Sequence, residues 1–252
     1  MLTTRQRSSI RNGLDRNREH LAAVLTYPPI DPSVSYSTQV HARLRHAIVR
    51  GHLPPGAVLS ESAIAAAVGT SRTPVREALQ QLVREQLVDI YPQVGTRVAP
   101  LRIGLIQEGC FVRRALECAN LLDLVNTISA SQRRELHTAL AQHRVALRRG
   151  DPEAMFRCDE TLHRRMFEFA GRPRVWTLIL GTKLHLDRVR WLLLDRVPQH
   201  AERILKEHRA IYDRLVENDR RGMSTEMQRH IEAVATHLGD LRGRLPENWF
   251  ED

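Results

Sequence analysis

Apolar residues recur at helical spacing along most of the chain. Three such segments come first, over residues 37–51, 60–69 and 71–86, with Ser, Pro and Gly at their ends as is typical of helix boundaries. The period then shortens to that of a strand, and two short strands are predicted over 88–91 and 96–99, on either side of a turn. Three helices followed by a hairpin predict a winged helix-turn-helix.

The remainder of the chain shows only helical spacing. Pro, Gly and Ser residues divide it into six predicted helices: 103–128, 131–149, 152–170, 173–197, 199–219 and 222–243. Since no strand period is present, this part should form an antiparallel all-helical bundle. The fold class is therefore mostly α, in three parts: a mobile N-terminal extension with a short helix near 14–25 (1–34), a winged helix-turn-helix (35–101) and a helical domain (102–252).

Charge and cysteine content narrow the possible partners. The net charge is +9, and 36 of the 38 basic residues are Arg. Such a balance favours a polyanion such as DNA, because guanidinium groups hold phosphate and guanine in a bidentate way, although codon bias accounts for most of the Arg excess. Three unpaired cysteines, no secretory signal and no membrane-spanning apolar run predict a cytoplasmic protein without a membrane partner.

The third predicted helix carries the sharpest functional signal. Its apolar stripe leaves Arg72, Thr73, Arg76 and Gln80 on the opposite face, with the two arginines one turn apart. The N-terminal end of a recognition helix enters the major groove, where a guanidinium fork can hold a guanine edge. Taken alone, the arginine pair would be an ordinary solvated face; the surrounding helices and hairpin favour DNA reading.

The hairpin predicts a second DNA contact. Gly95 at its tip would let the main chain approach the minor groove or a phosphate, and Arg97 flanks it.

Three polar residues fall within the apolar stripes of the helical domain, and a fourth lies at the margin of one. Asp159 and His163 lie one turn apart on one helix, and His208 and His230 lie on two later helices. Buried together, a carboxylate and three imidazoles are costly unless paired or bound to a metal, and as ligands they suit Zn, Ni, Co or Mn. The alternative is that each is a hydrogen-bonded core residue. We assign that role to His137, His143, His185 and His237, of which His237 is the closest rival as a ligand.

The run Ser71–Leu79 (SRTPVREAL), with the turn Gly51–Gly56 (GHLPPG) before it, closely resembles the GntR family of bacterial regulators, and residues 37–241 resemble its FadR subfamily, whose C-terminal domain is called FCD. The resemblance implies that Arg72, Thr73, Arg76 and Gly95 contact DNA. Two positions depart from it. Ser62 stands where some relatives have a DNA-contacting Arg, so the operator need not be theirs, and Gln86 replaces a usual Gly, with a slightly different helix end expected.

The resemblance also bears on the polar residues of the second domain. FCD domains of the metal-binding type carry an Asp-x3-His and two later His, which Asp159, His163, His208 and His230 match in type and order. The resemblance implies a divalent transition metal, with Zn or Ni favoured, beside a pocket for small organic acids. It further implies that Arg113 holds the carboxylate of such an effector.

On the predicted fourth helix of the bundle, Arg190 and Arg188 are weaker candidates for the same carboxylate, and a surface salt-bridge role is the favoured interpretation for both.

These observations predict a homodimeric regulator, commonly a repressor in this family, that binds an imperfect palindrome in double-stranded DNA under the control of a small carboxylate. Two other classes stay open. A metal-dependent hydrolase or lyase with a DNA-binding appendage could use the same ligands, although no HExxH motif or general base accompanies them. A protein that coats nucleic acid without sequence preference would not need the Arg72 and Arg76 placement.

Overall fold

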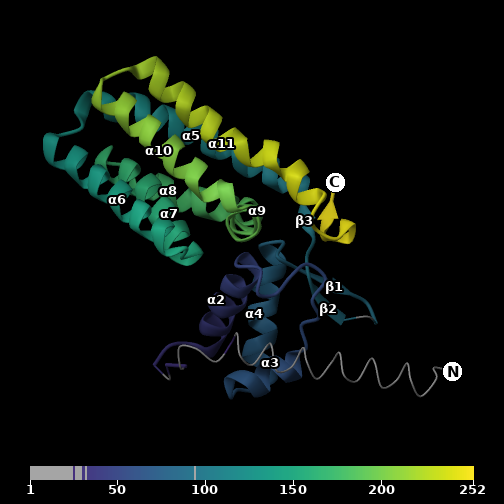
Figure 1. Ribbon diagram of the computed structural model, residues 1–252. Coiled ribbons are helices and arrows are strands. Elements are labelled where there is room, and N and C mark those ends of the chain that lie inside the picture. The colour runs from purple at the N-terminus through teal and green to yellow at the C-terminus, as the bar shows by residue number, and fades with distance from the viewer. Residues whose placement is uncertain (1–24, 26–29, 32, 94) are drawn as a thin grey trace. The chain divides into compact units, whose positions relative to one another are not determined.

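The computed structural model describes residues 25, 30–31, 33–93 and 95–252, so most of the predicted N-terminal extension and its helix lie outside the described residues. The described chain divides into two compact units, residues 1–100 and 101–252. Figure 1 shows the elements of each unit with their labels. Each unit is described by itself below.

The first unit is a three-helix core with a hairpin. Its elements are α2 (Tyr36–Val49), α3 (Glu61–Val68), α4 (Arg72–Arg84), β1 (Val88–Tyr91) and β2 (Gly95–Val98). Helix α4 packs against both α2 and α3, and β1 pairs with β2 antiparallel from Val88↔Val98 to Tyr91↔Gly95. The apolar stripes predicted for these helices are buried, because each helix packs its one apolar face against the other elements. The predicted winged helix-turn-helix is confirmed.

The ends of these helices show how the sequence fixes them. The Ser60 side chain accepts a hydrogen bond from the Ala63 amide and so caps α3, which ends at Gly69 in the left-handed conformation. Ser71 occupies the cap position of α4 without a side-chain bond. Gln86, where relatives have Gly, itself adopts φ 58°, so the turn after α4 is made at the steric cost of a left-handed non-glycine residue.

The segment before α2 is packed at one described position. Leu25 is fully buried and helical, and its carbonyl accepts a hydrogen bond from the Arg43 guanidinium.

The second unit is a helical bundle. It contains α5 (Ile103–Thr127), α6 (Ala130–Arg149), α7 (Pro152–Phe169), α8 (Pro173–Thr182), α9 (Leu184–Arg196), α10 (Pro198–Val216) and α11 (Arg220–Arg242). Helices α5, α10 and α11 run alongside one another, and α6 lies along α7, as Figure 1 shows. Aliphatic side chains from α5, α6, α7, α9, α10 and α11 share one core. The predicted bundle is confirmed, with caps at Ser129 and Asp219 that set the starts of α6 and α11.

Two predictions for this unit are wrong. The helix expected over 173–197 is broken at Lys183 into α8 and α9. Lys183 is buried there between Glu160 (2.8 Å) and Asp187 (2.5 Å), and α5 comes so close at Gly109 that a Cβ would lie 3.1 Å from the Thr182 carbonyl oxygen. The buried ammonium meets both of its carboxylates at this break.

A short parallel sheet is also present, although no strand was expected in this unit. Strand β3 (Leu101–Arg102) pairs with β4 (Phe250–Glu251) next to a 3-10 turn, η1 (Glu247–Trp249). Two-residue strands have too few positions to show a period, which is why the sequence pattern misses them. Among the described residues, no helix is both long and apolar enough to cross a bilayer.

Candidate metal centre and DNA-reading helix

The four predicted ligands meet inside the bundle. Asp159 and His163 rise from α7 one turn apart, His208 comes from α10 and His230 from α11. Each is at least 94% buried, and one ligand atom from each lies within 4.8 Å of the ligand atoms of the other three. This is the donor set of a divalent transition ion: three borderline nitrogen ligands and one hard oxygen ligand.

Two carboxylates behind the cluster fix the orientation of two of the imidazoles. The Nδ1 atom of His163 lies 2.5 Å from Oε2 of Glu117, and the Nδ1 atom of His230 lies 2.8 Å from Oε2 of Glu207. Since a carboxylate accepts the Nδ1 proton, the Nε2 atom of each ring is left as an acceptor. Metal-bound histidines show this arrangement, which fixes the tautomer and makes the ligand nitrogen more basic.

His208 lies at the centre of the cluster. Its Nε2 atom is 3.4 Å from Oδ1 of Asp159 and 3.3 Å from Nε2 of His230. Its Nδ1 atom has no hydrogen-bond partner among the described residues. Three polar atoms of different residues therefore face one another across a gap of the size that a single ion spans.

Charge in the cluster is set by burial and by one arginine. Burial by itself would raise the pKa of Asp159, but Arg190, which donates a hydrogen bond to it, and the nearby histidines hold that pKa well below its usual range. Burial lowers the pKa of His208 well below its usual range, and burial also lowers the pKa of His230. Asp159 therefore stands as a carboxylate and His208 and His230 as neutral imidazoles, the protonation states that ligands require.

Both predicted effector arginines lie beside the cluster. Arg113 on α5 is 1% exposed, and its Nε atom lies 2.6 Å from Oε1 of Glu117. Arg190 on α9 is 4% exposed and pairs with Glu160 and Asp187 in addition to Asp159. The surface salt-bridge interpretation of Arg188 and Arg190 is wrong, because both side chains are buried. Helix α9 is buried on nearly every face from Leu184 to Leu193, so the bundle encloses its polar residues along with its apolar ones.

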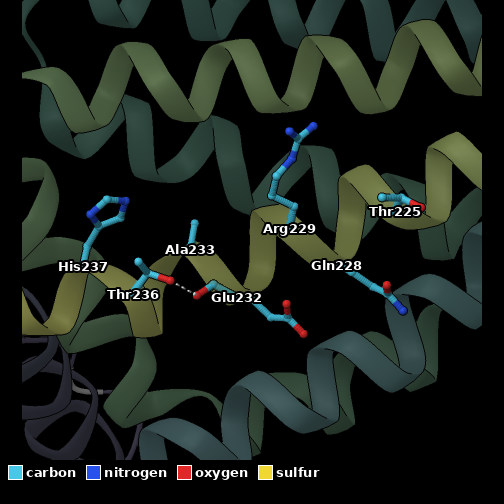
Figure 2. A pocket seen from close by; sticks show the side chains of 7 residues that line it. All are labelled: Thr225, Gln228, Arg229, Glu232, Ala233, Thr236 and His237. Carbon is cyan, nitrogen blue, oxygen red and sulfur yellow. Dashed lines mark hydrogen bonds between the residues drawn. The ribbon is translucent and has the colours of Figure 1, made fainter.

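The other histidines separate clearly from the ligand set. His143 is buried with its ring centroid 5.4 Å from that of His208, but it is not part of the four-residue cluster. His237, the closest rival, receives a hydrogen bond from Arg203 and lines a surface groove of about 350 Å³ along α11. Figure 2 shows the seven side chains of this groove, all rising from the one helix.

Three polar residues near the cluster have no counterpart among the predicted site residues. Glu207, His200 and Arg203 lie on α10, and with Arg113, Asp159, Arg190 and His230 they line a small cavity at the cluster. Glu207 precedes a predicted ligand, but a position next to a ligand in a helix points about 100° away from it, so the sequence offered no reason to select it.

The DNA-reading residues predicted on α4 are all exposed, over the buried stripe of Val75, Ala78 and Leu79. The Arg76 guanidinium forms a fork with Glu61 of α3, with Nε 3.1 Å from Oε1 and Nη2 2.8 Å from Oε2. The guanidinium of Arg72 makes no hydrogen bond with the described residues. Glu61 thus fixes the orientation of Arg76, whereas no hydrogen bond to a described residue restrains Arg72.

The hairpin places its two predicted residues differently. Gly95 is exposed at the turn with φ 115°, a conformation that favours glycine. Arg97 is half-buried and donates a hydrogen bond to the Gly56 carbonyl at 3.0 Å, so its guanidinium braces the loop before α3.

Buried histidines outside the ligand set predict a pH-dependent stability. Burial, together with the Arg203 charge, lowers the pKa of His200 to about 3, and burial lowers the pKa of His143. In the unfolded chain both rings would titrate at about pH 6.5, so below that pH the unfolded state binds more protons than the folded state does. Each residue should therefore cost up to about 1.4 kcal/mol of stability per pH unit as the pH falls.

We expect the melting temperature to fall steadily from pH 7 to pH 5, and to fall less steeply in His200→Gln. A melting temperature that stays level over this range, measured by circular dichroism, would contradict the burial of these rings as neutral groups.

Comparisons with known proteins bear on both units. Residues 36–98 match the family described as bacterial regulatory proteins, gntR family, and residues 108–233 match the FCD domain. The chain is 34% identical over 214 residues to an HTH-type transcriptional regulator of Streptomyces ambofaciens, covering 84% of this chain and 89% of the relative. It is 29% identical over 223 residues to the HTH-type transcriptional repressor RspR of Escherichia coli, covering 88% and 97%.

A solved structure agrees with these matches. A putative GntR transcriptional regulator from Rhodococcus sp. RHA1 superposes with a TM-score of 0.68 at 28% identity, over 82% of this chain and 99% of that one. The relatives are regulators, which excludes the alternative of a metal-dependent enzyme. Exposed arginines on a recognition helix, a hairpin wing and a helical second domain thus belong to one known arrangement. The chain is a member of the GntR family of bacterial regulatory proteins, a DNA-binding transcriptional regulator with a C-terminal FCD domain.

Proposed function

We propose that this regulator binds one divalent transition ion through Asp159, His163, His208 and His230, and that a small carboxylate effector bound beside the ion controls its affinity for an operator. The observation that carries the proposal is the cluster itself: four buried ligand atoms within 4.8 Å of one another. Three imidazoles with one carboxylate favour Zn or Ni over Mg or Ca, which prefer all-oxygen sites.

The surroundings of the four residues fit an ion better than a simple hydrogen-bonded core. Glu117 and Glu207 take the Nδ1 protons of two rings and so direct acceptor nitrogens, not donors, toward one another. Acceptors that face one another repel unless a proton or a positive charge lies between them; at His163 the Arg113 guanidinium, whose Nη2 atom is 3.3 Å from Nε2, supplies part of that charge. When bound, the ion would supply that charge and a coordination position for an acidic ligand.

Arg113 and Arg190 would hold the effector carboxylate beside the ion. Both guanidiniums line the small cavity next to Asp159 and His230. Each is already oriented by carboxylates, Arg113 by Glu117 and Arg190 by Asp159, so binding would use donors whose direction is set in advance.

Effector binding would act on the winged helix-turn-helix through a homodimer. One such unit reads a half-site, and two related by a twofold axis read an imperfect palindrome. A change in the spacing or mobility of the two units would weaken the fit to both half-sites at once. Repression relieved by effector is the proposed mode, supported by the repressor name of the RspR relative, and the FadR subfamily is the proposed subdivision.

Elemental analysis of the purified full-length chain tests the proposal directly. We expect about one divalent transition ion per chain, and a lower melting temperature after chelation because four buried polar groups lose their partner. Protein that takes up no ion after incubation with Zn or Ni, with an unchanged melting temperature, would contradict it.

Exposed apolar side chains in the second unit predict where the dimer forms. Phe111 on α5 is 63% exposed and Leu178 on α8 is 68% exposed, and these two helices pack against each other. Full-length protein should sediment as a dimer at micromolar concentration without DNA. Phe111→Ser combined with Leu178→Ser should shift it toward monomer, since a contact between copies would bury these side chains.

The matched control for the dimer is Val145→Ser, an exposed apolar position on α6. A wild-type monomer under these conditions would contradict the dimer, and a variant that stays dimeric would place the contact on another face.

A further inference from the structure

Arg203 lines the cavity beside the ligand cluster, and its charge is compensated less directly than those of the other two arginines there. Arg113 pairs with Glu117 at 2.6 Å, and Arg190 pairs with carboxylates on α7 and α9. Arg203 instead donates hydrogen bonds to two ring nitrogens, Nδ1 of His200 and Nε2 of His237. Its closest carboxylate is Glu207 at 3.5 Å, and that group is held by His230.

The arginine bond fixes the tautomer of His200. Because Nδ1 of His200 accepts from Arg203, the ring proton must sit on Nε2. That Nε2 atom is buried and has no hydrogen-bond partner among the described residues, although His200 lines the cavity and is only 3% exposed. A buried donor without an acceptor is costly, so this N–H is most simply explained by an acceptor that enters the cavity.

Arg203 and His200 therefore form one wall of the cavity that offers donors, and the one carboxylate paired with this wall is that of Glu207, which His230 also holds. The ligand cluster forms another part of the lining, through Asp159 and His230. The free space between the walls is about 10 Å³, enough for about one water molecule, so a ligand must displace side chains. Arg203 is suited to move, because its side chain is one-third exposed.

We propose that Arg203 and His200 bind the second carboxylate of a dicarboxylate effector, whose first carboxylate lies at the ligand cluster. This inference rests on the proposed function and makes it more specific: the effector is a small diacid and not a monoacid. Both residues line the cavity, so the ring N–H of His200 and the guanidinium of Arg203, once it turns from Nδ1 of that ring toward the ligand, can each donate to one carboxylate oxygen. Arg203, at one-third exposure, is also the most accessible of the three arginines at the cavity, so it would be the first group that an incoming anion meets.

The test compares diacids with their monoamides on metal-loaded, full-length protein. Malonate, succinate and glutarate are titrated by calorimetry against malonamate, succinamate and glutaramate, which keep size and shape but lose one charge. We expect at least one diacid to bind at least about 10-fold tighter than its monoamide, the effect of one charge-assisted contact.

Arg203→Gln should remove that preference by weakening diacid binding about 10-fold, with monoamide affinity and metal content unchanged. Arg203→Lys, which keeps the charge, should restore part of it. Arg209→Gln is the matched control, because Arg209 lies on the same helix, is exposed and pairs with Asp213.

Two results would overturn the inference, and they differ in what they leave standing. If a monoamide binds as tightly as its diacid, or if Arg209→Gln weakens diacid binding as much as Arg203→Gln does, the second carboxylate site is wrong while an acid effector at the metal remains. If none of the six acids binds to fully metal-loaded protein, both the diacid site and the proposed acid effector are wrong.

Discussion

The His163→Ala and His208→Ala variants should purify almost free of the divalent ion that we propose for the wild-type chain. Each change removes one of the four ligands of a buried site and leaves only three to hold the ion. Loss of an outer hydrogen-bond partner already costs roughly 10- to 100-fold in metal affinity. Loss of a ligand should therefore cost at least about 100-fold, measured as ions per chain by elemental analysis after dialysis.

Variants of two other histidines serve as controls, because they distinguish the loss of a metal ligand from a general destabilisation of the bundle. His143→Ala removes a buried ring whose centroid is 5.4 Å from that of His208, and His237→Ala removes a ring in the groove on α11. Both should keep the full metal content. A fully loaded His208→Ala protein, or metal loss in His237→Ala alone, would show that the ligands are different residues.

The outer carboxylates refine the same experiment. Glu117→Gln and Glu207→Gln keep the shape of the side chain but can present an amide N–H where an imidazole proton now points. Metal content should fall by an intermediate amount in each, because the ligand itself remains. If both variants keep the wild-type metal content, these contacts orient the rings without changing the affinity for the ion.

The sequence predicts the cluster well because its members obey helical spacing. Asp159 and His163 are one turn apart on α7, His208 falls within an apolar stripe and His230 lies at the margin of one, so burial follows from periodicity alone. Periodicity does not predict that the polar residues of α7, α10 and α11 lie at the same level along the bundle and so meet. The resemblance to the FCD domain supplied that information.

What the sequence does not reveal depends on contacts between helices. Lys183 reads as a minor interruption in an apolar run, yet two carboxylates on α7 and α9 enclose it and the helix breaks there. Arg190 reads as a surface charge because its helix alternates charged and apolar residues, and only packing between the helices buries it. Ion pairs between elements depend on the rotation of each helix, which a single sequence does not encode in any local pattern.

Arg72→Ala should weaken binding to the operator by about 1–3 kcal/mol, or roughly 5- to 150-fold, with a much smaller loss on random DNA. Arg72 stands at the start of α4, exposed and free of hydrogen bonds with the described residues, where a guanidinium can hold both acceptors of a guanine. Fluorescence anisotropy at one fixed salt concentration, with an operator selected from a random pool, measures both losses. Arg84→Ala, at the far end of the same helix, is the control for charge.

Arg76→Ala should behave differently because of its partner. The fork between Arg76 and Glu61 means that removing the arginine also leaves an unpaired carboxylate near the phosphates. Binding to random DNA should therefore weaken as well, through repulsion between Glu61 and the backbone.

The double variant Glu61→Gln with Arg76→Ala separates these two effects. It should recover the affinity for random DNA and keep the loss on the operator, because only the repulsion has been removed. Equal losses on operator and random DNA in Arg72→Ala, and again in the double variant, would show that these arginines touch phosphates only. Sequence would then have to be read elsewhere on the helix, where Thr73 and Gln80 are the exposed residues that remain.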